Sequence, residues 1–135
     1  MESCEVLLPA GSHVRHPAPG NFLSWETERI DLPGGPMPFA KGDLEGSCSV
    51  EFGATESRVL RLVGAACGRP VEVDMSVAPY FTLWSKLPDD FIRSEPRGGL
   101  PDQHERRPFE EKLAIQEIPP EGELRKSFAI RLPEP

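Results

Sequence analysis

The sequence predicts an all-β protein with the architecture of an antiparallel β-sandwich. Sixteen prolines and twelve glycines make up about a fifth of the 135 residues, and locked φ angles and missing N–H donors disfavour long helices. Short apolar or β-branched runs recur along the chain with turn residues between them, a spacing typical of a sandwich. The length predicts one domain over residues 1–135.

The expected strands are runs in which apolar or β-branched residues alternate or cluster. They cover residues 4–8, 22–25, 29–32, 48–52, 59–63, 71–75, 80–84, 113–118 and 127–132. Proline, glycine and aspartate separate many of these runs, and these residues either preset φ or tolerate a positive φ. The one helix candidate, residues 109–113, is interpreted as the approach to a strand.

Charge and composition exclude several classes of function. The chain has 15 basic and 22 acidic residues and a net charge of −7, without the basic cluster that nucleic-acid binding requires. No apolar run approaches the length of a membrane span, and Glu2 stands where a signal peptide has a positive residue. We therefore expect a cytoplasmic protein without nucleic-acid or membrane partners. Its three cysteines form no CxxC pair, which argues against a zinc or redox site.

Residues 11–22 contain two histidines, His13 and His16, in a proline-rich stretch expected to form a loop. Because the ordinary pKa of histidine lies near neutrality, either ring is a candidate general acid. The alternative interpretation is that each histidine is a solvated surface residue of the loop. Their spacing also suits a metal site, but no third or fourth ligand lies nearby in the sequence, so no metal is expected.

Glu95 is the candidate general base. It lies after a short apolar strand, before Pro96, and close in sequence to aromatic residues that would desolvate the carboxylate and raise its pKa. The alternative is a solvated turn residue that forms an ion pair with Arg93 or Arg97.

Five segments in chain order resemble the C-terminal half of the aldose 1-epimerase family, also called galactose mutarotase-like proteins. They are HPAPGNF at 16–22, FAKGD at 39–43, YFTLWSK at 80–86, FIRSEPRGGLPD at 91–102 and PEGE at 120–123. The similarity is greatest to the shorter bacterial branch with the LacX-like and glucose-6-phosphate 1-epimerase-like members.

This resemblance implies a sandwich that interconverts the α and β anomers of an aldose by ring opening, without a cofactor. Carried over to this sequence, Glu95 is the base and His16 the acid, with His13 as the fallback acid. Asp43 would hydrogen-bond sugar hydroxyls, and Trp84 would either form a wall of the site or be a core aromatic. Arg97 stands where the family has an aromatic residue and would meet an acidic or phosphorylated sugar.

The resemblance leaves two further readings open. A non-catalytic carbohydrate-binding module on the same sandwich is one, and an inactive truncated relative is the other, since the family's sandwich has about twice as many residues as the segment matched here. Missing strands would leave sheet edges open. The sequence therefore predicts, as a further possibility, a homodimer through those edges.

Overall fold

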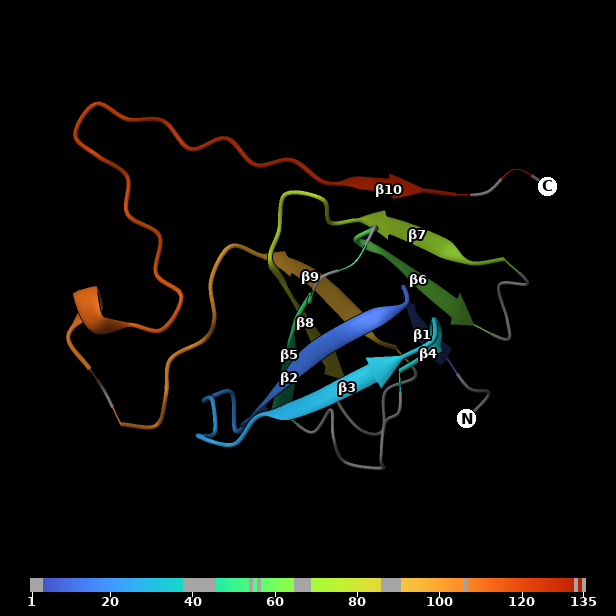
Figure 1. Ribbon diagram of the computed structural model, residues 1–135, viewed down its shortest axis with the longest axis horizontal. Coiled ribbons are helices and arrows are strands. Elements are labelled where there is room, and N and C mark those ends of the chain that lie inside the picture. The colour runs from blue at the N-terminus through green and yellow to red at the C-terminus, as the bar shows by residue number, and fades with distance from the viewer. Residues whose placement is uncertain are drawn as a thin grey trace.

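Two five-stranded antiparallel sheets form the sandwich, as the sequence predicts (Figure 1). The computed structural model describes residues 4–37, 46–53, 55, 57–64, 69–85, 91–105, 107–132 and 134. In the described residues the elements are β1 (Cys4–Leu8), β2 (Gly11–Pro19), β3 (Glu28–Leu32), β4 (Gly35–Pro36), β5 (Gly46–Glu51), β6 (Val59–Gly64), β7 (Val71–Asp74), β8 (Tyr80–Ser85), β9 (Arg93–Arg97), the short 3-10 helix η1 (Phe109–Glu111) and β10 (Ala129–Arg131).

The strand order places residues distant in sequence side by side. Sheet A has the order β10-β7-β6-β1-β4, and sheet B has the order β3-β2-β5-β8-β9. Every pairing in both sheets is antiparallel. The candidate acid and base therefore lie in one sheet, His16 on β2 and Glu95 on the edge strand β9.

The core lies between the sheets and follows from the period of two along each strand. On β5 and β8 the inward residues are Cys48 and Val50, and Phe81 and Leu83, all at most 2% exposed. They belong to one cluster with residues of sheet A, which include Val6, Leu60 and Val73. The residues between them on β5 and β8 therefore point to the opposite face of sheet B.

Several expected elements differ from the structure. Residues 11–19, predicted as a loop, form β2, and the prolines are tolerated because β3 pairs only with residues 11–15, so that the later part of β2 has one strand neighbour. The run 22–25 forms only an isolated bridge from Leu23 to Gln103. Residues 113–118 form no strand, and four of the six are exposed.

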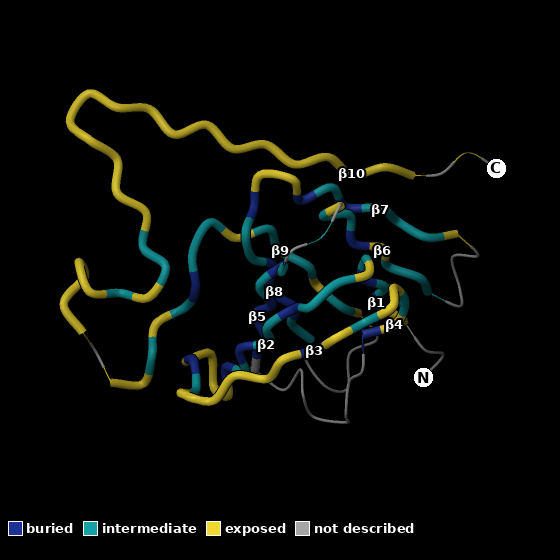
Figure 2. The backbone as a smooth tube through the Cα atoms, viewed as in Figure 1, coloured by how far each residue is buried: buried dark blue, intermediate teal, exposed yellow. Residues whose placement is uncertain are grey.

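The last part of the chain leaves the sandwich after β9 and returns to the edge of sheet A as β10 (Figure 1). Burial is concentrated in the sheets, whereas the returning segment is exposed along its length (Figure 2). Among the described residues, no helix has the length and apolar character to cross a membrane.

Candidate active site on the outer face of sheet B

The face of sheet B that points away from sheet A carries most of the predicted site residues. Residues directly opposite each other in an antiparallel pair share a face, so the strand register defines rows across β2, β5, β8 and β9. The three rows are Val14, Glu51, Tyr80 and Arg97; His16, Ser49, Thr82 and Glu95; and Ala18, Ser47, Trp84 and Arg93.

The middle row joins the predicted acid to the predicted base. Between His16 and Glu95 lie Ser49 and Thr82, whose hydroxyls form a buried hydrogen bond of 2.9 Å. At about 4.8 Å per strand spacing, the Cα atoms of His16 and Glu95 are about 14 Å apart. The two side chains therefore flank a buried pair of hydroxyl groups, Ser49 being 0% and Thr82 3% exposed.

His16 is a buried strand residue, and the expectation of a solvated loop is wrong for it. His16 is 9% exposed. Its ring packs edge-on against the Tyr80 ring, with 6.4 Å between the two ring centroids. The Nε2 atom lies 3.6 Å from Oε2 of Glu51, and it is buried without a hydrogen-bond partner. A buried ring nitrogen without a hydrogen-bond partner is uncommon in folded proteins, which marks His16 as a candidate functional residue.

Glu95 is held by arginines on both sides rather than by aromatic residues. Arg97 contacts Oε2 at 2.6 Å and Arg93 contacts Oε1 at 3.5 Å. The ion pair that the sequence offered as an alternative is thus confirmed for both arginines. Arg97 is consequently already paired with a carboxylate, and Oε1 is the less tightly held of the two Glu95 oxygens.

Trp84 and Tyr80 supply the aromatic surface of this face. Trp84 lies outside the core, with the Arg93 guanidinium 5.7 Å from its ring centroid and the Phe91 ring 5.5 Å away. Burial raises the pKa of the Tyr80 hydroxyl, and the nearby Glu51 carboxylate adds to this effect. Tyr80 therefore stays a neutral hydrogen-bonding group at physiological pH.

His13, the fallback acid, lies on the opposite face of β2 from His16. It is fully buried, its Nε2 lies 3.0 Å from the Pro9 carbonyl oxygen, and its ring packs edge-on against Phe52. Its expected loop position is therefore wrong, and the structure makes it part of the interior. Asp43 and the FAKGD segment lie outside the described residues.

The chain after β9 crosses to the loop that follows β2, where it packs on sheet B. Leu100 forms a second apolar cluster with Ala18 and Leu23, and Tyr80 and Ala114 pack against it. The Leu23 N–H donates a 2.8 Å hydrogen bond to the Asp102 carbonyl. Because Ala18 and Tyr80 belong to the outer face, this segment covers part of that face.

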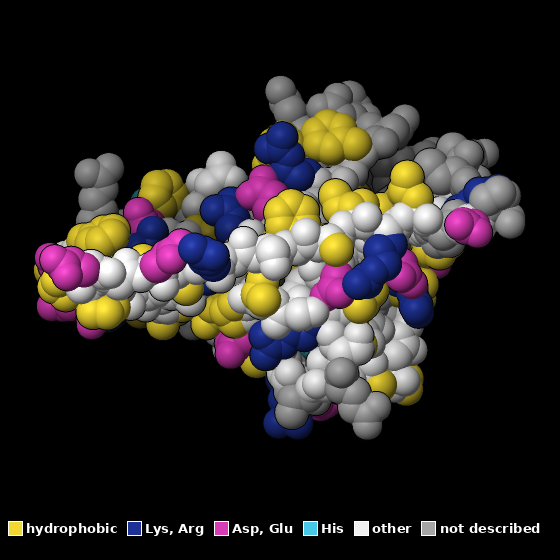
Figure 3. Space-filling view, turned by 90° about the horizontal axis from the view of Figure 1, so that it is seen from above, with side chains coloured by type: hydrophobic (Ala, Val, Ile, Leu, Met, Phe, Trp, Pro, Cys, Tyr) yellow, Lys and Arg dark blue, Asp and Glu magenta, His cyan; other side chains and the backbone are white. Residues whose placement is uncertain are grey.

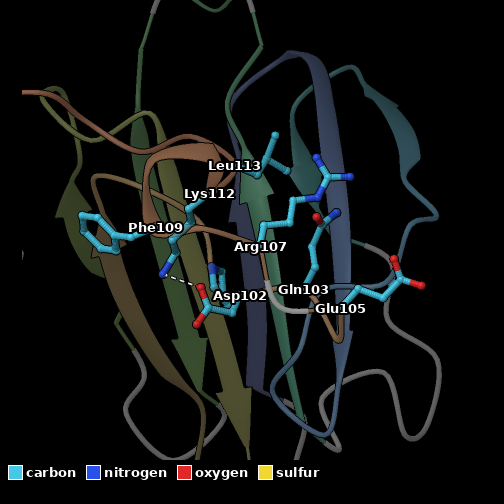
Figure 4. A pocket seen from close by; sticks show the side chains of 8 residues that line it. Asp102, Gln103, Glu105, Arg107, Phe109, Lys112 and Leu113 are labelled. Carbon is cyan, nitrogen blue, oxygen red and sulfur yellow. Dashed lines mark ion pairs between the residues drawn. The ribbon is translucent and has the colours of Figure 1, made fainter.

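A cavity of about 290 Å³ lies within the same segment (Figure 4). Its lining combines charged, amide and apolar side chains: Pro101, Asp102, Gln103, Glu105, Arg107, Phe109, Lys112 and Leu113. Lys112 and Asp102 point toward each other in an ion pair of 2.8 Å. Sequence reasoning missed this cavity, since most of its lining residues follow the motif that ends at Asp102 and show no period of their own.

No three His, Cys, Asp or Glu side chains of the described residues are placed to hold a metal ion. Comparisons of the chain with models of protein families, with curated proteins and with solved structures find no match.

Proposed function

We propose that this protein is an aldose 1-epimerase-like isomerase that works on the outer face of sheet B. One observation carries the proposal: the register places His16 and Glu95 in one row of one face, with the hydroxyls of Ser49 and Thr82 between them. A sugar bound with C1 above the middle of this row would turn its ring oxygen toward His16 and its anomeric hydroxyl toward Glu95. The substrate class is a small sugar or a sugar phosphate.

The proposed reaction transfers two protons and breaks one bond. The Glu95 carboxylate takes the proton of the anomeric hydroxyl while His16 gives a proton to the ring oxygen. The bond between C1 and the ring oxygen then breaks, leaving an open-chain aldehyde. Rotation about C1–C2 and the reverse proton transfers close the ring as the other anomer, so no cofactor takes part and both residues return to their starting state.

The contacts of Glu95 assign roles to its two oxygens. Arg97 holds Oε2 at 2.6 Å, whereas Arg93 is 3.5 Å from Oε1. A hydroxyl can displace the longer contact more readily, because ion pairs weaken with distance. We therefore assign Oε1 as the proton acceptor and Arg97 as the residue that orients the carboxylate.

Glu51 and Tyr80 would orient His16. The Glu51 carboxylate is the acidic group facing Nε2, at 3.6 Å, and Tyr80 packs against the ring. A ring held from two sides keeps Nε2 directed at one position, which is what efficient proton transfer requires. A cytoplasmic location is part of the same proposal.

The ion pairs of Glu95 favour a second candidate, a carbohydrate-binding module without catalysis. Both carboxylate oxygens contact guanidinium groups, and a carboxylate that stays in these pairs positions hydroxyls but takes up no proton. Trp84 on the same face suits this role, since aromatic rings supply the apolar surface of ligand sites.

The test is anomer exchange of freshly dissolved α-glucose, α-galactose and glucose 6-phosphate, followed by NMR, with the wild-type chain, Glu95→Gln and Glu72→Gln. Glu72 is a matched control because it also pairs with an arginine, Arg61, but on sheet A. We expect exchange above the buffer rate in wild type and Glu72→Gln, and its loss in Glu95→Gln.

Sugar binding, measured by chemical-shift changes in the protein, separates the two candidates. Binding of any of these sugars without faster exchange would support the binding module and contradict the isomerase. A folded wild-type chain with neither exchange nor binding would contradict both.

A further inference from the structure

The last described part of the chain forms an arm with little support from the rest of the protein. Every residue from 116 to 132 is exposed, and the arm runs back over one edge of the sandwich (Figures 1 and 2). A space-filling view onto this edge shows hydrophobic and charged side chains along it (Figure 3). The large exposed hydrophobic residues of the arm are Ile118, Leu124, Phe128, Ile130 and Leu132, each 48–74% exposed.

Five of the eleven large exposed hydrophobic residues in the described part of the chain lie in this one segment. Contiguous exposed apolar residues mark surfaces that a partner covers. The arm is long enough to reach beyond its own sandwich, because residues 112–128 form no helix or strand and an extended chain of that length spans up to about 55 Å. The arm therefore has both the reach and the apolar surface for an intermolecular contact.

The contacts that attach the arm to sheet A can form either within one chain or between two chains. β10 pairs with β7 at three positions, Ala129 with Asp74, Ile130 with Val73 and Arg131 with Glu72. Arg131 also donates to Asp74 at 2.8 Å. None of the β10 side chains is buried, so the strand joins the sheet edge without becoming part of a core.

The connection to the arm contains strained backbone. Ala114 and Glu121 have φ values of 57° and 60°, a region that side chains with a Cβ adopt only at an energetic cost. Pro119 and Pro120 stiffen the turn between them. Strain in a hinge favours the exchange of an element between copies, since opening the hinge releases the strain while the element keeps its contacts.

We propose that two copies of this chain exchange their arms, so that β10 of each copy pairs with β7 of the other. The occupant of the β7 edge is then a second copy, because the register and the Arg131–Asp74 ion pair are preserved unchanged by the exchange. The apolar side chains of the two arms become covered between the copies. This inference concerns assembly and is independent of the proposed isomerase.

The test reverses the ion pair in separate chains. Asp74→Arg places two cations opposite each other, and Arg131→Asp places two anions there, so each variant alone weakens its own β7–β10 contact. In an exchanged heterodimer of the two variants, one interface regains the native pair and the other gains the reversed pair. Mixing therefore restores both contacts only if arms pass between chains.

We expect light scattering after size exclusion to give twice the 14.9 kDa chain mass for wild type, with dimerisation weakened at least several-fold in each variant alone. An equimolar mixture should return to wild-type dimerisation. The double variant, Asp74→Arg with Arg131→Asp, should dimerise like wild type and shows that the substitutions permit folding.

Arg15→Glu and Glu28→Arg provide the matched control, because their ion pair joins β2 to β3 within one sandwich. Each control variant alone should lose stability, and mixing the two should not restore it, because this ion pair is not exchanged between chains. A wild-type chain that is monomeric up to NMR concentrations would overturn the proposal. So would a dimer that forms equally in all single variants, which indicates contact through other sheet edges.

If a charge-reversed variant does not fold, disulfide cross-linking through introduced cysteines tests the exchange instead. Glu72 and Arg131 are register partners on β7 and β10. A chain with Glu72→Cys and a chain with Arg131→Cys are purified separately, mixed and oxidised. A disulfide-linked heterodimer in high yield is the result expected from exchange. Its absence, while the double-cysteine chain forms only an internal disulfide, contradicts the exchange.

Discussion

The centre of sheet B and the β10 edge of sheet A are both strands of apolar and polar residues, but their surroundings differ. On β8, Phe81, Thr82 and Leu83 are all at most 3% exposed, because sheet A covers one face and neighbouring side chains and the segment after β9 shield the other. On β10 all three residues are exposed. The comparison shows that strand pairing alone orders backbone, whereas burial requires a second layer.

The largest effect should come from removing a core side chain of β8. Phe81→Ala takes a fully buried ring from the cluster between the sheets and should lower the free energy of unfolding by about 3–5 kcal/mol. Phe109→Ala is the control, since this ring is 73% exposed, and it should change stability by at most about 0.5 kcal/mol. Urea unfolding followed by tryptophan fluorescence measures both, and equal losses would contradict the assigned core.

Substitution of the two histidines of β2 should cost different amounts of stability, since His13 is the more deeply buried. His13→Ala removes a fully buried ring that contacts Phe52 and should cost about 2–4 kcal/mol of stability. His16→Ala should leave the domain folded, with a loss of about 1–2 kcal/mol of stability because its ring is nearly buried.

Thermal unfolding with His104→Ala as the exposed control compares the three variants. Rates of anomer exchange, measured only where each variant is folded, separate the roles of the two histidines. Loss of exchange in a folded His13→Ala protein would contradict its placement away from the site.

The hydroxyls of Ser49 and Thr82 in the middle row should be energetically coupled, because they share a hydrogen bond. Ser49→Ala and Thr82→Val each leave one buried hydroxyl without its partner, so each single change costs more than an exposed substitution. The double variant should be about 1 kcal/mol more stable than the sum of the singles implies. A double-mutant cycle from urea unfolding measures this, and strict additivity would show that the hydrogen bond contributes nothing.

The smallest effect is a dependence on pH at the β10 edge. Hydrogen bonds from Ser76 and then from Arg131 lower the pKa of Asp74 below its ordinary value of 3.8. A group with a lowered pKa stabilises the folded state above its unfolded pKa, and this stabilisation is lost as the pH falls from about 3.8 through the folded-state value. Asp74→Asn should therefore flatten the acid limb of a plot of melting temperature against pH.

Asp31 on β3 gives the same test away from the arm. Its pKa is lowered by hydrogen bonds from Ser12 and Arg29, so Asp31→Asn should flatten the acid limb without changing the oligomeric state. An Asp74→Asn variant with an unchanged acid limb would contradict the contacts of this carboxylate at the edge.

Much of the fold could be predicted because strands and turns are local. The alternation in residues 71–75 and the apolar run at 80–84 correspond to β7 and β8, since a period of two selects one buried face. Prediction failed at residues 11–19, where prolines and glycine indicate a loop and tertiary pairing with β5 outweighs that preference. It also failed at 113–118, where apolar residues exist but no strand pairs with them.

The sequence by itself determined which residues alternate along each strand and therefore which ones share a face. It placed His13 and His16 only three positions apart, with nothing local to say which of them would be inside. The tertiary structure decided that, and it also decided that residues 16, 49, 82 and 95 form one row. The physical reason is that register arises from pairing between distant strands and from the layer that covers each face, and neither is encoded within a single segment.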